Sequence, residues 1–432
     1  MKELLEKVFS IDKLKSSLKV EVLAGISTFL SLSYIFVVNP AILSAAGIPK
    51  SAAFFATIVG SVVTTLAMGL WANKPFAVAP GLEMNAYVAF VVVGSLGFSW
   101  QGAMGAVFWS GVLTVILSLT SLRVNIIKAI PDKLKFGLSA SVGVFLMLIA
   151  LKVSNLTAYQ GIQIIGLGKI VSKEALVFLV GLALVLVLKK FKVKGSVLIS
   201  IIGASVLANL IGSSQSIEPI KLGREMFSGT FALDLSVILN PKIWSVVIIL
   251  FILDFYGSIA KFIGLTQNTL IVDEQGNLPK MKEALIIDGA GTVLGASLGT
   301  SNLITFVESA VGIGEGGRTG LVAVVCGVLM SLFLFLTPLV NLVPVVATAG
   351  ALFFVGWSLL PKLDDVKKYT WAEIVSLAAM ILVTIWTFGL DKAMFAGFVS
   401  FTVFGLIVNF KQKPNYYLWG STIVLLVSIL LS

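Results

Sequence analysis

Glu308 stands inside an otherwise uncharged and mostly apolar stretch, Thr300-Ser-Asn-Leu-Ile-Thr-Phe-Val-Glu308-Ser-Ala-Val-Gly-Ile-Gly314. The stretch is apolar enough to enter a bilayer, where a carboxylate costs at least a few kcal/mol. A carboxylate in such a place normally faces a polar cavity or a transport pathway. The stretch therefore predicts a membrane protein that moves a solute.

The composition supports a membrane protein. Hydrophobic residues make up 58% of the chain, charged residues 12%, and the mean hydropathy is +1.04, whereas soluble domains carry about 25% charged residues. One cysteine, Cys326, excludes an intrachain disulfide and a multi-cysteine metal site. The chain has no histidine, which excludes a His-ligated metal and a histidine proton relay. We expect no cofactor, no metal and no enzyme activity.

Apolar windows predict an all-α polytopic protein with about fourteen transmembrane spans. The windows lie near 20–38, 51–73, 76–93, 101–120, 135–151, 174–188, 196–213, 243–265, 284–298, 300–313, 319–340, 342–360, 371–388 and 392–410. A last, shorter stretch, 416–431, fits a fifteenth span, a re-entrant segment or a surface helix, and these three alternatives stay open.

The basic residues predict the orientation. Most of the 31 Lys and Arg residues fall in loops on the same side as the N-terminus, which the positive-inside rule assigns to the cytoplasm. Residues 1–19 are amphipathic, carry no cleavable signal and predict a cytoplasmic surface helix. The net charge of +10 is then explained by basic residues in the cytoplasmic loops, so it does not indicate a nucleic-acid partner. We expect a multi-pass protein of the cytoplasmic membrane, surrounded by membrane lipid.

Two spans are broken in the same way. The third contains Phe76-Ala-Val-Ala-Pro80-Gly81-Leu-Glu83-Met-Asn85, in which an extended start reaches a Pro-Gly pair before a helix resumes. The tenth repeats this design and aligns Glu308 with Glu83. The two lie seven spans apart, so they run in opposite directions, as an inverted repeat requires. Interrupted helices at corresponding places in two halves point to a transporter's binding site.

Several motifs together resemble the nucleobase-cation symporters, and within them the AzgA-like branch of adenine, guanine and hypoxanthine permeases. The resemblance covers nearly the whole chain. Its more specific pieces are Ala79-Pro80-Gly81 with Asn85-Ala86, Ala129-Ile-Pro131, Asp273-Glu-Gln-Gly276-Asn-Leu-Pro279, and Gly299-Thr300-Ser301 through Val307-Glu308-Ser309 to Gly316-Gly317-Arg318-Thr319-Gly320.

The resemblance implies a fold and a function. The fold would be two inverted seven-span repeats, arranged as a core domain (20–120 and 243–340) and a gate domain (121–242 and 341–432). The function would be uptake of a purine nucleobase by alternating access, coupled to H+ or, as the alternative, to Na+. The substrate would sit between the facing half-helices of spans 3 and 10. Members are commonly homodimers.

Three residues carry over from the family pattern. The resemblance implies that Glu308 accepts from the base and that Phe306 stacks on its ring. Asp254 keeps the first of two acids expected in the eighth span. Glu308, Asp254 and Glu83 are the candidates to carry a transported proton. For two of them a structural role is the alternative: Glu308 would cap its half-helix, and Asp254 would hold spans 1 and 8 together.

Three positions depart from the family pattern. Gly257 stands where the second acid is expected, Lys261 replaces a small hydroxyl residue, and Glu83 replaces a glycine. Gly257 and Lys261 share one helical face, which leaves room for a neighbour. We expect Glu83 to pair with Lys261 at the edge of the substrate site, because either charge alone would be costly there. The alternative is that Lys261 extends to the cytoplasmic interface.

Small polar residues complete the predicted substrate site. Each would either bind the edge of a base or join two helices by a hydrogen bond. They are Asn85, Ser258, Thr305, Ser309 and Thr28.

Two other function classes remain as alternatives. A channel or anion transporter of the same fold, the fold of sulfate and bicarbonate carriers, would explain a lysine in the site. The acids at Glu83 and Glu308 argue against it. A membrane-embedded enzyme would need a catalytic constellation, and the sequence contains none that we recognise.

Overall fold

The computed structural model describes residues 2–120, 132–160, 163–193, 195–213, 223–266, 269–273, 278–336, 343–361, 363–387, 390–408, 419–420, 422–423 and 426. The chain is mostly helical, with two short antiparallel strand pairs. The motif at 129–131, part of the motif at 273–279 and most of the stretch 416–431 lie outside the described residues.

The first half of the chain contains two interrupted apolar segments, the strand β1 and a strand hairpin. Its elements are α1 (Lys2–Phe9), α2 (Leu18–Leu32), α3 (Ile35–Ser44), α4 (Lys50–Leu70), β1 (Val78–Pro80), α5 (Leu82–Ala86), the π-helix η1 (Tyr87–Val93), α6 (Trp100–Leu119), α8 (Asp132–Val153), β2 (Thr157–Gln160), β3 (Gln163–Leu167), α9 (Lys173–Lys190) and α10 (Ser196–Leu210).

The second half begins with two short 3-10 helices and contains the partner strand β4. Its elements are η2 (Arg224–Phe227), η3 (Leu235–Leu239), α11 (Ile243–Thr266), α12 (Met281–Leu298), β4 (Leu303–Thr305), α13 (Ser309–Gly314), α14 (Gly320–Ser331), the 3-10 helix η4 (Leu332–Leu336), α16 (Val345–Ser358), α17 (Leu363–Val366), α18 (Trp371–Thr387) and α19 (Leu390–Val408).

Among the described residues, three helical segments are long and apolar enough to cross a membrane: Leu18–Ser44, Lys50–Leu70 and Trp100–Leu119. Shorter apolar helices make up most of the rest. Large apolar side chains are exposed along several helices, as expected for surfaces that contact lipid. Examples are Leu119, Leu210, Leu382 and Trp386.

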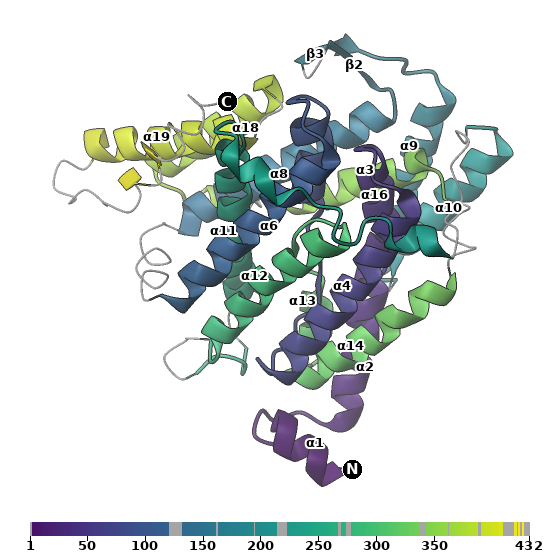
Figure 1. Cartoon of the computed structure of the whole chain (residues 1–432), viewed down its shortest axis with the longest axis vertical. Helices are drawn as coiled ribbons and strands as arrows, with labels where there is room; N and C mark the ends of the chain where they lie inside the picture. Colours follow the sequence, from purple (N-terminus) through teal and green to yellow (C-terminus); the bar gives the residue numbers. More distant parts are fainter. Residues whose placement is uncertain are drawn as a thin grey trace.

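Helices that are far apart in sequence lie side by side (Figure 1). In one set, α4 packs against α12 and α14, α2 packs against α13 and α14, and α6 packs against α11 and α12. In another, α16 packs against α8, α9 and α10, and α18 packs against α8 and α19. Small residues permit close contacts: a Cβ atom on Gly111 of α6 would lie 2.9 Å from the backbone nitrogen of Val293 in α12.

The two predicted extended segments cross each other. β1 and β4 pair antiparallel, with Val78 opposite Thr305 and Pro80 opposite Leu303. Two flanking hydrogen bonds are related by the same local two-fold symmetry: Phe306 N–H donates to Ala77 O at 2.9 Å, and Gly81 N–H donates to Asn302 O at 3.2 Å.

Short helices follow both strands, α5 after β1 and α13 after β4. Glu83 and Glu308 therefore each stand three residues after their own strand. The expected extended starts of both broken helices, and the correspondence of Glu83 with Glu308, are confirmed.

The first apolar segment is also broken. α2 ends at Leu32 and α3 begins at Ile35. Pro40 lies inside α3 and has no N–H to donate along the helix. The break leaves Tyr34 at the N-cap of α3, where its side chain is 2% exposed. Tyr34 therefore points its hydroxyl into the protein.

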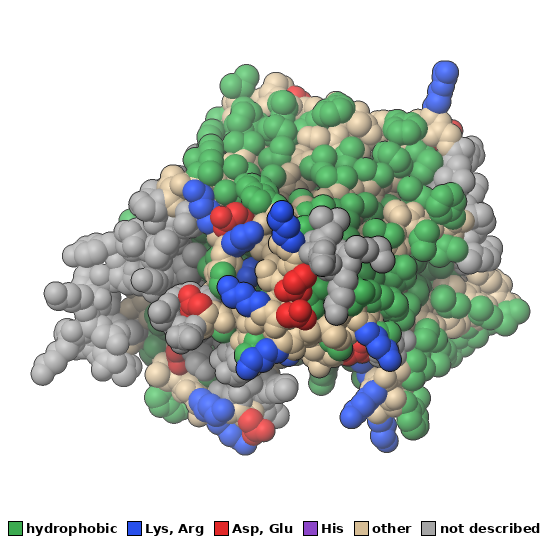
Figure 2. Space-filling view, turned by 90° about the horizontal axis from the view of Figure 1, so that it is seen from below, with side chains coloured by type: hydrophobic (Ala, Val, Ile, Leu, Met, Phe, Trp, Pro, Cys, Tyr) green, Lys and Arg blue, Asp and Glu red, His purple; other side chains and the backbone are tan. Residues whose placement is uncertain are grey.

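Charged side chains gather on the face of the molecule that carries α1, whereas hydrophobic side chains cover much of the surface beside them (Figure 2).

Polar contacts hold this end of the molecule together. Glu21 accepts from the backbone N–H of Arg318 at 2.9 Å and of Thr319 at 3.1 Å. Asn73 accepts from Gly320 N–H at 2.7 Å and donates to Phe9 O at 3.0 Å. These contacts tie α1 and α2 to the start of α14.

Candidate functional site

Glu308 lies where the crossing strand β4 leads into α13. It occupies the N-cap position of α13, yet its side chain makes no capping hydrogen bond. The structural alternative, a carboxylate that caps this helix, is therefore wrong. Oε1 accepts from the Tyr34 hydroxyl at 2.7 Å, and Oε2 is buried with no hydrogen-bond partner among the described residues. One oxygen is held by Tyr34, and the other retains the capacity to accept a further hydrogen bond.

Tyr34 belongs to the site as the partner of Glu308, whereas the sequence alone indicates it only as a weak candidate in the first span, beside Thr28. It comes from the break between α2 and α3, and its hydroxyl reaches Glu308 across 274 residues of sequence. The available sequence signal was a tyrosine six residues before Pro40 in an apolar segment. That signal indicates a local break and does not indicate the partner.

Glu83 and Lys261 form the expected ion pair. Lys261 Nζ lies 3.4 Å from Glu83 Oε1, and the two side chains are 16% and 17% exposed. Lys261 therefore points to Glu83 in α5, so the alternative in which it extends to the cytoplasmic interface is wrong. A Cβ atom on Gly257, one turn earlier in α11, would meet no atom within 4 Å. The absence of a side chain at Gly257 leaves open space beside this pair.

Three predicted residues lie at the strand crossing and support it. Phe306 is buried, at 6% exposure, directly after β4. The Ser309 hydroxyl accepts from Ala77 N–H at 3.0 Å. Thr305 donates its N–H and its hydroxyl to the two oxygens of Asp288, at 3.2 and 3.1 Å. Ser309 and Thr305 thus brace the extended segments on which Glu308 is mounted.

Asp254 is buried in the middle of α11. Its Oδ2 accepts from Thr292 of α12 at 3.0 Å and from Thr114 of α6 at 3.4 Å. The predicted structural alternative named the wrong partner, because Asp254 joins α11 to α6 and α12 rather than to the first span. Oδ1 has no hydrogen-bond partner of good geometry in the described chain. Ser258, one turn later, is buried with its hydroxyl beside Asp288.

The other two predicted residues are also buried. Asn85 donates to Asn39 Oδ1, and Asn39 in turn donates to Thr57 at 2.7 Å and to Thr300 at 2.9 Å. Asn85 thus belongs to a polar network between helices, although its own Oδ1 has no partner in the described part of the chain. Thr28 of α2 packs against the Gly312 backbone of α13.

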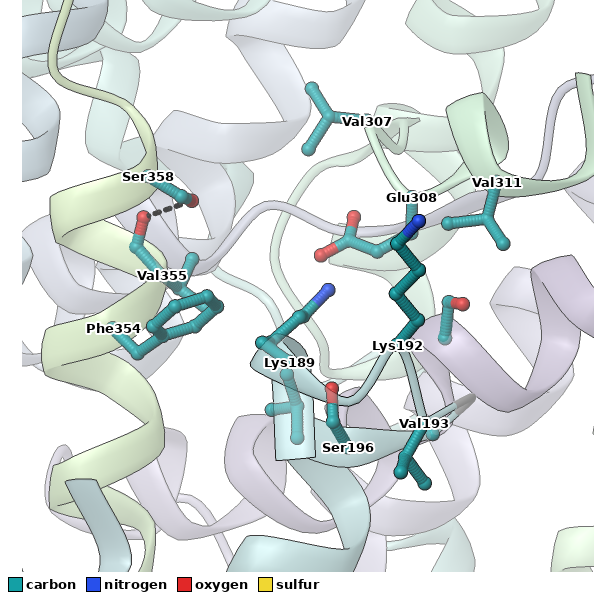
Figure 3. A pocket seen from close by; sticks show the side chains of 13 residues that line it. Lys189, Lys192, Val193, Ser196, Val307, Glu308, Val311, Phe354, Val355 and Ser358 are labelled. Atoms are coloured by element: carbon teal, nitrogen blue, oxygen red, sulfur yellow. Dashed lines mark hydrogen bonds between the residues drawn. The ribbon is translucent and has the colours of Figure 1, made fainter. Parts of the chain in front are cut away.

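A cavity of about 410 Å³ opens beside Glu308 (Figure 3). Its walls come from α2, from the start of α13, from the turn between α9 and α10, and from α16. Glu308 is the predicted site residue that lines this cavity among the residues described. Lys189, in the last turn of α9, and Lys192, in the turn that follows, extend toward Glu308 (Figure 3). From the sequence alone, both lysines indicate only the orientation of the chain in the membrane. Among the described residues, no group of three acidic, histidine or cysteine side chains could hold a metal ion.

Comparisons with known proteins identify the family. A family model described as the permease family, that of the xanthine and uracil permeases, matches residues 19–386. The adenine permease AdeP of Escherichia coli is 32% identical over 93% of this chain and 90% of its own length. The guanine/hypoxanthine permease PbuO of Bacillus subtilis is 33% identical over 92% of this chain and 93% of its own length.

Solved structures show the same fold in other membrane transporters. The transmembrane domain of the cyanobacterial bicarbonate transporter BicA has a TM-score of 0.63 at 16% identity, covering 88% of this chain and 97% of that one. The murine anion transporter Solute Carrier 26 family member A9 has a TM-score of 0.65 at 12% identity, covering 96% and 73%. The predicted class of mostly helical polytopic membrane protein is confirmed. The chain belongs to the xanthine/uracil permease family, and it is a membrane transporter rather than an enzyme.

Proposed function

We propose that the protein takes up purine nucleobases across the cytoplasmic membrane by ion-coupled alternating access. The observation that carries this proposal is the half-satisfied Glu308 carboxylate. One oxygen is held by Tyr34, the other has no partner among the described residues, and a cavity begins at this point. A carboxylate held in this way can accept from the ring N–H of a purine. AdeP and PbuO, named for purine transport, support this choice of substrate.

The contact between Glu83 and Lys261 removes the argument that Lys261 is a cation placed to bind an anionic substrate. An anion transporter of this fold would use a cation in the site, and Lys261 was the candidate. Its charge is already compensated by Glu83 at 3.4 Å. Likeness to anion transporters at 12–16% identity concerns the fold alone.

We propose H+ as the coupled ion, with Na+ as the alternative. Of the three candidates, Glu83 is paired with Lys261 and Asp254 is bonded between helices. Glu308 is the acid that lines the cavity and retains a free oxygen. Glu308 would therefore couple the two ligands: a proton on one carboxyl oxygen leaves the other oxygen to accept from the substrate N–H, so that proton and base bind together.

The proposed architecture is two inverted seven-span repeats. The core domain would comprise 20–120 and 243–340, and the gate domain 121–242 and 341–432. The local two-fold symmetry of the β1–β4 crossing supports inversion. The cavity lies between Glu308 of the proposed core and residues such as Phe354 of the proposed gate, so rocking between the domains would open and close it. We further propose a cytoplasmic N-terminus and a homodimer.

The test is uptake into proteoliposomes. Labelled adenine, guanine, hypoxanthine, uracil and sulfate would each be supplied with and without a pH gradient, and with and without Na+. The proposal predicts saturable purine uptake that a proton gradient drives and that Glu308→Gln abolishes. Sulfate uptake, or no purine uptake under any gradient, would overturn it.

A further inference from the structure

We propose that the cavity beside Glu308 also binds a purine nucleoside 5′-monophosphate, which enters from the cytoplasmic side and blocks transport. The inference rests on the proposed function and adds a second ligand to it. A purine base would occupy the Glu308 end, and the phosphate would occupy the end formed by the α9–α10 turn.

The cavity has room for more than a base. Its volume of about 410 Å³ lies within the range of roughly 300–1,000 Å³ that is typical of small-molecule sites. Its lining carries charges of both signs. Glu308 presents a carboxylate oxygen without a partner among the described residues, and Lys189 and Lys192 present two ammonium groups. A ligand that satisfies both ends must carry N–H donors at one end and an anion at the other.

The α9–α10 turn has the features of a phosphate site. α10 starts at Ser196, and its N-cap is Gly195, whose φ of +71° is left-handed and whose lack of a side chain leaves the first turn uncapped. Gly195 and Ser196 both line the cavity. Free N–H groups and the positive end of the helix dipole favour a phosphate at such a point. Lys189 and Lys192 flank it from the preceding turn.

Neither Lys189 nor Lys192 is held in a salt bridge among the described residues, although Glu308 lies close enough to Lys189 for their charges to interact. Lys189 Nζ lies 5.8 Å from the centre of the Phe354 ring, on the opposite wall (Figure 3). Phe354 provides an apolar face in the same cavity, against which a sugar or a base can pack.

A nucleotide matches this arrangement better than simpler ligands. Inorganic phosphate would leave the Glu308 oxygen without a donor, and a free base would leave both lysines unpaired. A phospholipid head group shares the phosphate but has no purine ring to present to Glu308. Phosphoribosyl transfer to an imported purine base produces the corresponding nucleoside 5′-monophosphate. The proposed inhibitor would therefore be the product of the class of reaction that consumes the transported base.

Competition binding on the purified full-length protein tests the inference. Labelled purine base would be bound first. Four compounds would then be tested as competitors: the corresponding 5′-monophosphate, the nucleoside, ribose 5-phosphate and inorganic phosphate. We expect the monophosphate to compete at least ten-fold better than the nucleoside. The double variant Lys189→Gln/Lys192→Gln should remove that advantage. Lys190→Gln, the matched control on a neighbouring lysine that does not line the cavity, should preserve it.

Sidedness and lipid form the second part of the test. In oriented vesicles, the monophosphate should inhibit base transport from the cytoplasmic face only. Base binding without nucleotide competition, or competition that survives the double lysine variant, would overturn the inference and leave the proposed function intact. Failure to bind any base would overturn the proposed function instead.

Phosphatidylcholine vesicles with and without phosphatidylglycerol distinguish a nucleotide phosphate from a lipid phosphate. Loss of nucleotide competition on adding the anionic lipid would show a lipid site and refute the inference.

Discussion

A double-mutant cycle on the ion pair between Glu83 and Lys261 tests the most unusual part of the site. The perturbations are Glu83→Gln, Lys261→Met and the two combined. Each single change leaves a charge without its partner in a position that is only about one-sixth exposed. The double change removes both charges and keeps the size of both side chains.

The separation of 3.4 Å gives the expected magnitude. At an effective dielectric constant of 20, the Coulomb attraction at that distance is about 5 kcal/mol. Partial exposure and the cost of desolvating both groups reduce this value by roughly half. We expect each single variant to lose about 2 kcal/mol of folding free energy, the double variant to lose less than the two losses summed, and a coupling energy of about 2–3 kcal/mol.

The assay is the free energy of unfolding of the four proteins in the same detergent. The exposed pair of Asp364 and Lys367, with side chains 88% and 75% exposed and a contact of 2.9 Å, supplies a matched control. Its coupling should be below about 0.5 kcal/mol. Additive effects at Glu83 and Lys261, or a coupling no larger than that of the control, would refute the reasoning.

Three further predictions follow from single contacts. Tyr34→Phe removes the donor to Glu308 and should weaken purine binding by roughly 10- to 100-fold, as expected for a hydrogen bond to a charged group; unchanged affinity in equilibrium binding would contradict this. Gly257→Ala adds a methyl group where no atom lies within 4 Å, and it should raise the free energy of unfolding by up to about 1 kcal/mol because alanine favours a helix over glycine. Gly111→Ala places its methyl group 2.9 Å from α12 and should lower the free energy of unfolding. Burial and the nearby Lys280 lower the pKa of Lys74 to about 8. A lysine with a lowered pKa destabilises the fold while it is charged, so stability should rise with pH between about 8 and 10.5, and Lys74→Met should abolish that part of the pH profile in unfolding measurements.

The two extended segments and one ion pair could be predicted from the sequence because they depend on local signals, whereas the pairing of β1 with β4 was not predicted. Pro80 and Gly81 interrupt an apolar segment, which marks an extended stretch at membrane depth. Gly257 and Lys261 share a helical face, and Glu83 departs from the family pattern at the matching place. These three departures together were enough to predict a contact across 178 residues of sequence.

Other contacts could not be predicted because no local pattern specifies them. The bond between Tyr34 and Glu308 depends on how α2, α3 and α13 pack. The partners of Asp254 were assigned to the wrong helix, since one acid in a span does not say which neighbour it faces. The segment that contains Lys189 and Lys192 is rich in lysine, as loops beside transmembrane spans commonly are. Only the folded chain brings these two lysines to the Glu308 cavity.

The central claim is that Glu308 binds a purine base. Equilibrium binding of labelled adenine, guanine and hypoxanthine to the purified protein tests it most directly, with Glu308→Gln as the variant. Glu315→Gln is the matched control, since Glu315 lies at the other end of α13 and accepts from Ser27 at 2.6 Å. We predict that at least one base binds saturably, that Glu308→Gln weakens it at least 100-fold, and that Glu315→Gln does not. Equal binding by the Glu308 variant, or no purine binding by the unmodified protein at any pH, would contradict the claim.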